Sequence, residues 1–225
     1  MGNQGLSGSS YNFSQSRFKR LFKSKPIRTV LLVGLNNSGK TTLMCNLNPS
    51  LLDYARGIEN VEQISTCPTS AISFVEFEKD RVKWRIWDMS GQGRFRNLWA
   101  YYSAHVEAII YVVDVSDTDR IATARDELQS LLDQPRVRDM HLPLLLFANK
   151  ADLGNADDLG ADTGSQSKKS SLSLENVRMA FGVDSMNQNR KVKVIFSSGL
   201  TGTGVAEGFT WLKDAIKSVG KGESV

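Results

Sequence analysis

The feature that most restricts how this chain can fold is the eight-residue stretch GLNNSGKT at Gly34–Thr41. It fits the pattern GxxxxGK(S/T), follows a short β-branched, apolar run at Thr29–Val33 and overlaps the start of a helical pattern at Gly39–Leu47. In that setting the glycines allow backbone N–H groups to wrap around phosphates, and the positive end of the helix dipole faces the same phosphates. The stretch therefore predicts a strand, a phosphate-binding loop and a helix that together bind a nucleotide.

Within this loop the residues have separate expected tasks. The ammonium group of Lys40 would reach the β- and γ-phosphates, and the hydroxyl group of Thr41 would bind Mg²⁺. The expected phosphate-binding set is Gly34, Asn36, Asn37, Ser38, Gly39, Lys40, Thr41 and Thr42. Mg²⁺ is thus an expected cofactor of the nucleotide.

Apolar runs alternate with helical patterns along the rest of the chain. Ala108–Val113 and Leu144–Phe147 are unbroken apolar runs, typical of buried parallel strands, and Asp119–Leu132 between them has the pattern of a helix. The other expected elements are strands at Ile72–Phe77 and Val82–Trp87 that form a hairpin around Lys79-Asp80, a strand at Val192–Phe196, and a helix at Val205–Val219 with Phe209, Leu212 and Ile216 in the core. The alternation indicates an α/β fold with a mostly parallel sheet.

The tetrapeptide NKAD at Asn149–Asp152 directly follows an apolar run, so it lies at the carboxyl end of an expected strand, where α/β sheets bind ligands. The Asp152 carboxylate can accept hydrogen bonds from both N1–H and the 2-amino group of guanine, whereas adenine has no N1 proton. Leaving such a group unpaired costs about 1–3 kcal/mol. Together with Asn149 and Lys150, this residue predicts GTP or GDP as the ligand, and it argues against a phosphate-loop kinase or ATPase.

A third motif, DMSGQ at Asp88–Gln92, follows the second hairpin strand. Asp88 can hold a water molecule on Mg²⁺, and the Gly91 N–H can meet the γ-phosphate. Gln92 can then orient the attacking water for in-line hydrolysis, a reaction that depends mostly on positioning and charge stabilisation. The motif predicts a GTPase in which Gln92 is the catalytic residue.

Composition and charge argue against several other kinds of protein. Hydrophobic residues make up 40% of the 225, and charged residues 23%, which is ordinary globular usage. The net charge of +4 arises from residues 1–25, which hold five bases and no acid, so the other 23 bases face 24 acids. A body with a charge of −1 argues against nucleic-acid binding. Two cysteines cannot form a disulfide framework, which favours a reducing, cytoplasmic location.

The basic segment at residues 1–25 differs from everything that follows. Phe18, Leu21 and Phe22 have the spacing of one helix face, and most of the bases lie around the other side, a pattern typical of a short helix in an anionic membrane interface. A disordered tail that only adds solubility is the alternative. Gly2 could carry a myristoyl group, although the pattern MGxxx(S/T) is not met. We expect a GTPase domain at residues 26–225, with a low-complexity surface insertion at 154–173.

Four strings resemble the Arf and Arf-like branch of the Ras-like small GTPases. They are GLNNSGKTT at 34–42, NPS at 48–50, WDMSGQGRFRNLW at 87–99 and FANKADL at 147–153. The resemblance implies a six-stranded sheet, with five strands parallel and one antiparallel, flanked by helices. It also implies a monomeric switch, controlled by an exchange factor and a GTPase-activating protein, that hydrolyses GTP slowly. In its GTP form such a switch recruits coat-type or other trafficking effectors to membranes, in vesicle traffic or at the base of a cilium or flagellum.

The same resemblance implies roles for individual residues. Thr69 matches the threonine of the first switch that closes over Mg²⁺ and the γ-phosphate. Ser198 and Gly199 fall in the loop that touches the guanine O6, and the contact comes from the Gly199 N–H. Trp87 and Tyr102 match two of three aromatic residues that effectors of this family contact.

The chain also departs from the family pattern. Ser70-Ala71-Ile72 replaces the usual Ile-Gly-Phe, so Ile72 stands where the third aromatic residue is expected. The stretch at 51–69 is longer than the usual first switch, and Asn36 stands where Asp is common. These changes leave open an alternative, a GTP-binding interaction module with negligible hydrolysis that scaffolds a coat or cargo complex.

Overall fold

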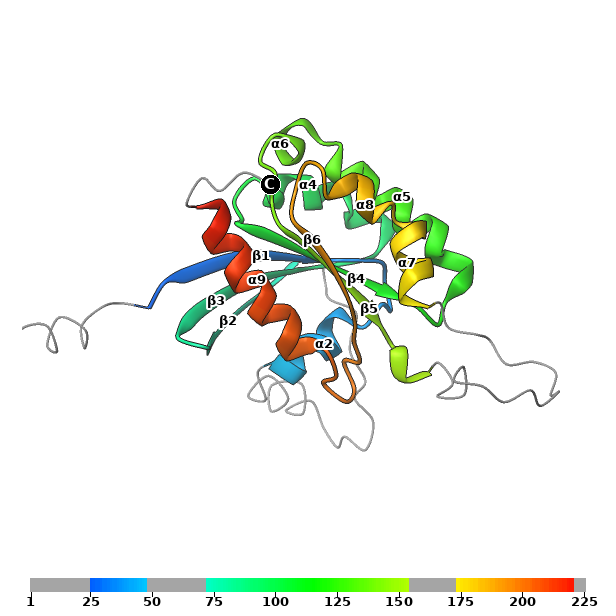
Figure 1. Ribbon diagram of the computed structural model, residues 1–225, viewed down its shortest axis with the longest axis horizontal. Helices are drawn as coiled ribbons and strands as arrows, with labels where there is room; N and C mark the ends of the chain where they lie inside the picture. The colour runs from blue at the N-terminus through cyan, green and yellow to red at the C-terminus, as the bar shows by residue number, and fades with distance from the viewer. Residues whose placement is uncertain (1–24, 48–71, 154–172, 221–225) are drawn as a thin grey trace, which may run out of the picture.

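The computed structural model describes residues 25–47, 72–153 and 173–220. Within these ranges a six-stranded sheet has the strand order β2-β3-β1-β4-β5-β6 (Figure 1). The strands are β1 (Ile27–Val33), β2 (Ile72–Lys79), β3 (Val82–Met89), β4 (Ala108–Asp114), β5 (Leu144–Asn149) and β6 (Val192–Phe196). Only the β2–β3 pair is antiparallel. The α/β fold with a mostly parallel sheet is therefore confirmed.

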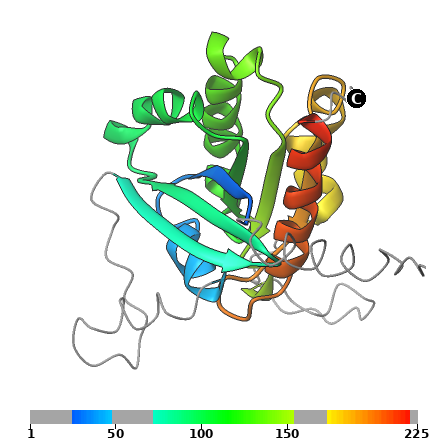
Figure 2. The ribbon, with the colours of Figure 1, turned by 90° about the vertical axis from the view of Figure 1, so that its left-hand side faces the viewer.

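Helices pack on both faces of this sheet (Figure 2). The helical segments are α2 (Lys40–Leu47), η1 (Gly93–Phe95), α4 (Asn97–Ser103), η2 (Thr118–Arg120), α5 (Ile121–Leu132), α6 (Pro135–Arg138), η3 (Ala151–Leu153), α7 (Leu174–Ala180), α8 (Val183–Met186) and α9 (Val205–Val219). Helices α2 and α9 contribute to one core cluster, whereas α4, α5 and α7 contribute to the other. No helix in the described ranges has the length and apolar character to cross a membrane.

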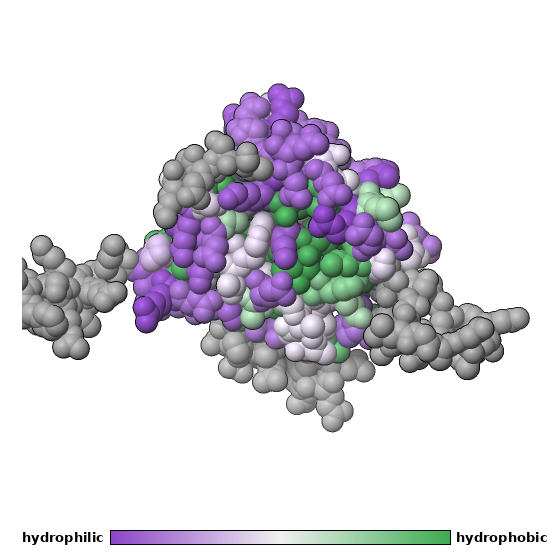
Figure 3. All heavy atoms as spheres, viewed as in Figure 1, coloured by the Kyte–Doolittle hydropathy of each residue, from purple (hydrophilic) through white to green (hydrophobic). Residues whose placement is uncertain are grey.

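The two-sided packing explains the sequence patterns. In β1, Leu31 and Val33 belong to one core cluster while Val30 and Leu32 belong to the other, so consecutive apolar residues are all buried. All seven residues of β4 are buried for the same reason. In strand β3 the burial of the side chains alternates instead: Val82, Trp84 and Ile86 are buried, and the residues between them are half-exposed. Figure 3 shows that on one face of the molecule the hydrophobic residues gather over β6, between α9 and α7.

Several local features differ from the sequence-based expectations. The hairpin turn lies at Asp80 and Arg81, which both adopt positive φ (53° and 63°), rather than at Lys79-Asp80. Helices α4, α6, α7 and α8 were not expected. Ser173, the last residue of the expected insertion, is the N-cap of α7, where its hydroxyl accepts a hydrogen bond from the Asn176 N–H. The predictions made for residues 1–24, 48–71 and 154–172 lie outside the described ranges.

Candidate nucleotide-binding site

The predicted motifs lie in loops that follow neighbouring strands. The phosphate-loop motif follows β1, the DMSGQ motif begins at the end of β3, and the NKAD motif begins at the end of β5. Strands β1 and β3 pair in parallel with Leu32 opposite Asp88, and β4 and β5 pair in parallel with Asp114 opposite Asn149. The carboxyl ends of these strands therefore meet at one edge of the sheet, the usual ligand-binding edge of α/β folds.

The phosphate loop has a backbone that only certain residues can adopt. Gly34 and Gly39 have φ values of 145° and 92°, in the region that favours glycine. A Cβ atom on Gly34 would lie 2.2 Å from the Val112 carbonyl oxygen, and one on Gly39 would lie 2.2 Å from Asn149 Nδ2. Both glycines are therefore required by conformation and by close packing.

Lys40 lies beneath this loop, with only 6% of its surface exposed. Its Nζ donates hydrogen bonds to the backbone oxygens of Gly34 and Leu35, at 2.9 and 2.8 Å. Burial lowers the pKa of Lys40 to about 8, and the nearby Asp88 carboxylate only partly opposes this effect. The site thus holds a desolvated cation that an anionic ligand would stabilise.

Thr41 and Asp88 form an oxygen-rich pair beside Lys40. The Thr41 hydroxyl donates to Asp88 Oδ2 at 3.4 Å, and within the described ranges the buried Asp88 Oδ1 has no hydrogen-bond partner. Burial raises the pKa of Asp88 to about 6, against the opposing charge of Lys40. A hydroxyl and a carboxylate are ligands that Mg²⁺ prefers, directly or through water. The residues present therefore fit a magnesium ion, whereas Thr69 lies outside the described residues.

The DMSGQ loop packs directly against the phosphate loop. The Gly91 carbonyl accepts hydrogen bonds from the Asn36 N–H at 3.2 Å and from Arg96 Nε at 3.1 Å. A Cβ atom on Gly91 would lie 2.3 Å from the Asn36 nitrogen. Gln92 is half-buried, and its N–H donates to the Ser90 hydroxyl at 3.4 Å, immediately before η1. Gly91 and the predicted catalytic Gln92 thus lie beside the phosphate loop.

At the other end of the site, Asn149 connects two loops. Its Nδ2 donates to the Ser38 carbonyl at 2.8 Å, and its Oδ1 accepts from the Gly199 N–H at 3.0 Å and the Ser197 hydroxyl at 3.3 Å. The side chain is almost wholly buried. Asn149 therefore holds the phosphate loop and the loop after β6 together. The Gly199 N–H, predicted to meet guanine, is engaged by Asn149 here, so a base would have to share or replace that bond.

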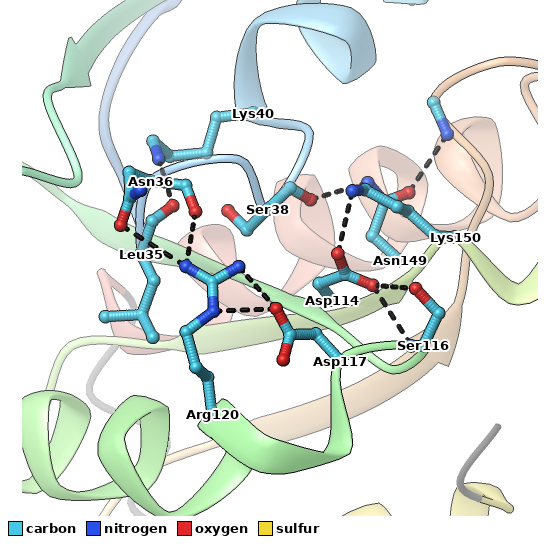
Figure 4. A network of polar contacts seen from close by, with 11 residues as sticks. Leu35, Asn36, Ser38, Lys40, Asp114, Ser116, Asp117, Arg120, Asn149 and Lys150 are labelled. Atoms are coloured by element: carbon cyan, nitrogen blue, oxygen red, sulfur yellow. Dashed lines mark hydrogen bonds and ion pairs between the residues drawn. The ribbon is translucent and has the colours of Figure 1, made fainter. Parts of the chain in front are cut away.

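Lys150 and Asp114 lie beside Asn149 (Figure 4). Lys150 Nζ forms an ion pair with Asp114 Oδ2 at 2.7 Å, and Asp114 Oδ1 accepts from the Ser116 hydroxyl at 2.6 Å. The Ser198 hydroxyl is buried and accepts a hydrogen bond from the Thr201 N–H at 3.1 Å. Asp152 is exposed on η3, while the predicted Thr42 lies half-buried in α2.

Two arginines contact the site although neither was among the predicted site residues. Arg96 donates to Gly91 and forms an ion pair with Glu127 of α5. Arg120 donates to the carbonyl and side-chain oxygens of Asn36, at 3.1 and 3.3 Å. Sequence reasoning missed both, because an arginine carries no signal in the sequence of what its side chain contacts across the fold.

Together, the glycine-rich phosphate loop, the Thr41–Asp88 pair and the Asn149 network define a phosphate-loop GTPase. Comparisons with known proteins agree with this class and narrow it. Residues 14–216 match the ADP-ribosylation factor family. ADP-ribosylation factor-like protein 6 of Danio rerio is 37% identical over 84% of this chain and 89% of its own length. ADP-ribosylation factor 3 of Arabidopsis thaliana is 31% identical over 89% of this chain and 94% of its own length.

A solved structure is also similar. The Arl6 (BBS3) small GTPase of Trypanosoma brucei, with the bound nucleotide analogue GppNp, superposes with a TM-score of 0.65 at 28% identity, over 85% of this chain and 98% of that one. The chain belongs to the ADP-ribosylation factor family. Members of this family bind GTP and GDP with Mg²⁺ and hydrolyse GTP, so the protein is a GTP hydrolase.

Proposed function

We propose that the protein is an Arf-like switch that recruits effectors to membranes in its GTP form and returns to its GDP form by slow hydrolysis. The observation that carries this proposal is the packing of the DMSGQ loop on the phosphate loop through Gly91 and Asn36. A change in the phosphates bound at one loop would directly displace the other. The nucleotide could thereby control what the DMSGQ loop and the hairpin before it present to partners.

Each residue of the site has a task in this proposal. Lys40 binds the β- and γ-phosphates, Thr41 and Asp88 hold Mg²⁺ directly and through water, and Gln92 orients the attacking water. When bound, the ion neutralises charge on the phosphates. Because Lys40 and Asp88 are buried, their charges act where water screens them little.

The base end of the site selects the nucleotide in the same proposal. Asp152 accepts hydrogen bonds from the guanine N1–H and amino group, and the loop of Ser198 and Gly199 borders the O6. Asn149 and Lys150 fix these loops through their contacts with Ser38 and Asp114. Thr69, the threonine expected in the first switch, would bind the ion and the γ-phosphate.

We place the effector surface on β2, β3 and α4. The rings of Phe74 and Trp87 lie 4.7 Å apart between their centroids, those of Trp87 and Tyr102 5.2 Å, and those of Tyr102 and Tyr101 5.3 Å. Phe74 is 45% exposed and Tyr101 62%. Phe74 lies two residues after Ile72, on the same face of β2. Phe74 thus supplies the third aromatic side chain that the substitution at Ile72 removes.

We further propose that the basic segment at residues 1–25 anchors the GTP form to anionic membranes. The named relatives in Danio rerio and Trypanosoma brucei are Arl6 proteins, which supports vesicle or ciliary and flagellar traffic as the setting. An exchange factor, a GTPase-activating protein and a coat-type effector are the partners that such a cytoplasmic, monomeric switch requires.

Liposome flotation tests the proposal. Full-length protein is loaded with GDP or with a non-hydrolysable GTP analogue and mixed with vesicles containing an anionic lipid. We expect flotation of the GTP-analogue form only, and loss of that flotation when the five bases of residues 1–25 are replaced by Gln. Equal flotation of both forms would contradict a switch in membrane residence.

Single-turnover hydrolysis with a GTPase-activating protein separates the switch from the alternative scaffold. We expect GTP turnover by the wild-type protein and a clear loss of turnover in Gln92→Leu, with GTP affinity retained. Equal, negligible turnover in both proteins would favour the interaction module that binds GTP without hydrolysing it.

A further inference from the structure

Arg120 connects a segment outside the nucleotide motifs to the phosphate loop. It is the last residue of η2, which follows β4, and Figure 4 shows its guanidinium group between Asp117 and Asn36. Nη1 donates to the Asn36 backbone oxygen at 3.1 Å and to Asn36 Oδ1 at 3.3 Å. Nε and Nη2 contact Asp117 Oδ2 at 2.7 and 2.6 Å. Asp117 therefore fixes the plane of the guanidinium, which directs Nη1 at the phosphate loop.

The contacted carbonyl belongs to the peptide group between Asn36 and Asn37. In a trans peptide the C=O and the following N–H point in opposite directions. Because Arg120 holds the oxygen, the Asn37 N–H points away from Arg120. Phosphate loops use such backbone N–H groups to bind phosphates, so a residue that fixes this peptide also fixes a donor to the nucleotide.

This part of the loop requires external contacts to keep its shape. Asn37 has a φ of 63°, in the left-handed region that side-chain-bearing residues rarely adopt. Such conformations persist where the surrounding structure holds them. On one side of Asn36 its N–H donates to Gly91, and on the other its carbonyl accepts from Arg120. Gly91 belongs to the DMSGQ loop, whereas Arg120 ends η2, directly before α5, and lies outside that loop.

We infer that Arg120 is a positioning residue that holds the Asn36–Asn37 peptide so that the Asn37 N–H faces the nucleotide phosphates, and that it thereby slows nucleotide release. The inference rests on the proposed nucleotide site and adds to it a residue outside every motif. Arg120 touches the loop and not the reacting atoms. Its effect is therefore on how long the nucleotide stays bound.

The test is the release of a fluorescent GDP analogue from full-length, Mg²⁺-loaded protein, chased with excess GDP. We expect Arg120→Ala to release it about tenfold faster, the effect of losing one hydrogen bond to a charged group. Arg125→Ala is the matched control, because Arg125 lies close by on α5 but is paired with its neighbour Asp126 on the surface.

A second measurement distinguishes positioning from general stabilisation. In the GDP-bound protein, the ¹⁵N–¹H resonance of the Asn37 amide should shift in Arg120→Ala and stay in place in Arg125→Ala. If Arg120→Ala does not fold, Arg120→Gln takes its place. The glutamine side chain is neutral and cannot make both contacts with Asp117, so nucleotide release should again be faster than in the wild type.

The outcomes are distinguishable. The inference would be overturned if Arg120→Ala released the nucleotide at the rate of Arg125→Ala. It would also be overturned if release were faster but the Asn37 resonance did not move. Either result would leave the nucleotide site intact. Failure of the wild-type protein to retain GDP would instead overturn the proposed function on which the inference rests.

Discussion

The site has a phosphate end, formed by the phosphate loop and Asp88, and a base end, formed by the loops of Asn149 and Gly199. The two ends differ in how their buried polar groups are satisfied. At the phosphate end, Lys40 and Asp88 are buried, and burial moves the pKa of the first down to about 8 and that of the second up to about 6. At the base end, the buried Asn149 has its amide satisfied by Ser38 and Gly199. One end carries buried charges that a ligand would stabilise, whereas at the other Asn149 is already hydrogen-bonded and the charges of Lys150 and Asp114 are already paired.

This difference predicts which property each end controls. Buried charges in a region that water screens poorly interact strongly with phosphates and Mg²⁺, so the phosphate end should control affinity. A satisfied hydrogen-bond network fixes the positions of loops, so the base end should control stability and selectivity. Substitution of Lys40 should therefore act mainly on nucleotide affinity, and substitution of Asn149 mainly on the stability of the nucleotide-free protein.

The largest effect is expected from Lys40→Met, which keeps the length of the side chain and removes its charge. Affinity for GDP and GTP should fall by about a hundredfold or more, because two charge-assisted contacts with phosphates are lost. Isothermal titration calorimetry with Mg²⁺ measures the change, and Lys213→Met on α9 is the matched control. Wild-type affinity in Lys40→Met would show that the phosphate end does not depend on this charge.

Asn149→Ala should act on the base end through stability. The change leaves the Ser38 carbonyl and the Gly199 N–H without their buried partner, which costs about 2–4 kcal/mol in the free energy of unfolding. Urea denaturation of the nucleotide-free protein measures the loss. Asn176→Ala, at an exposed position of α7, is the control and should change stability little. Equal stability of the two variants would refute the view that Asn149 holds the two loops together.

The two ends also differ in how far the sequence predicts them. The phosphate loop depends on local rules, since its glycines, the preceding strand and the following helix are contiguous, and the structure places them as expected. The strands and α9 follow from apolar patterns, and the buried Phe209, Leu212 and Ile216 confirm the predicted core of that helix.

The features that the sequence did not predict depend on contacts between distant segments. Asn149 was expected to border the base, but its partners lie 111 and 50 positions away in the chain. Arg120 contacts Asn36 across 84 positions. Helix α4 lacks an acidic first turn and a side-chain N-cap, so its packing through Trp99, rather than a start signal, explains why it forms.

Asp152→Asn should separate selectivity from stability at the base end. The amide presents a donor where guanine also presents donors, so GTP affinity should fall about tenfold to a hundredfold, and affinity for xanthosine triphosphate should rise. Because Asp152 is exposed, the urea midpoint of the nucleotide-free protein should stay within error of the wild type. Competition between GTP and xanthosine triphosphate measures the preference. Intact GTP preference would contradict the guanine assignment.

A further prediction is a pH dependence that belongs to the phosphate end. Burial raises the pKa of Asp88 from its ordinary 3.8 to about 6, so between these values the folded, nucleotide-free protein holds a proton that the unfolded chain has lost. Stability then falls as the pH rises from about 4 to 6, because protons favour the folded state there.

Thermal unfolding of the nucleotide-free protein across this range measures the fall, which should lower Tm by roughly 2–4 °C for each kcal/mol lost. Asp88→Asn cannot ionise, so its Tm should decline less over the same range. The same slope in both proteins would show that the carboxyl group of Asp88 is not desolvated before the nucleotide binds. The phosphate end would then be as well satisfied without a ligand as the base end is, and the contrast between them would rest on Lys40 alone.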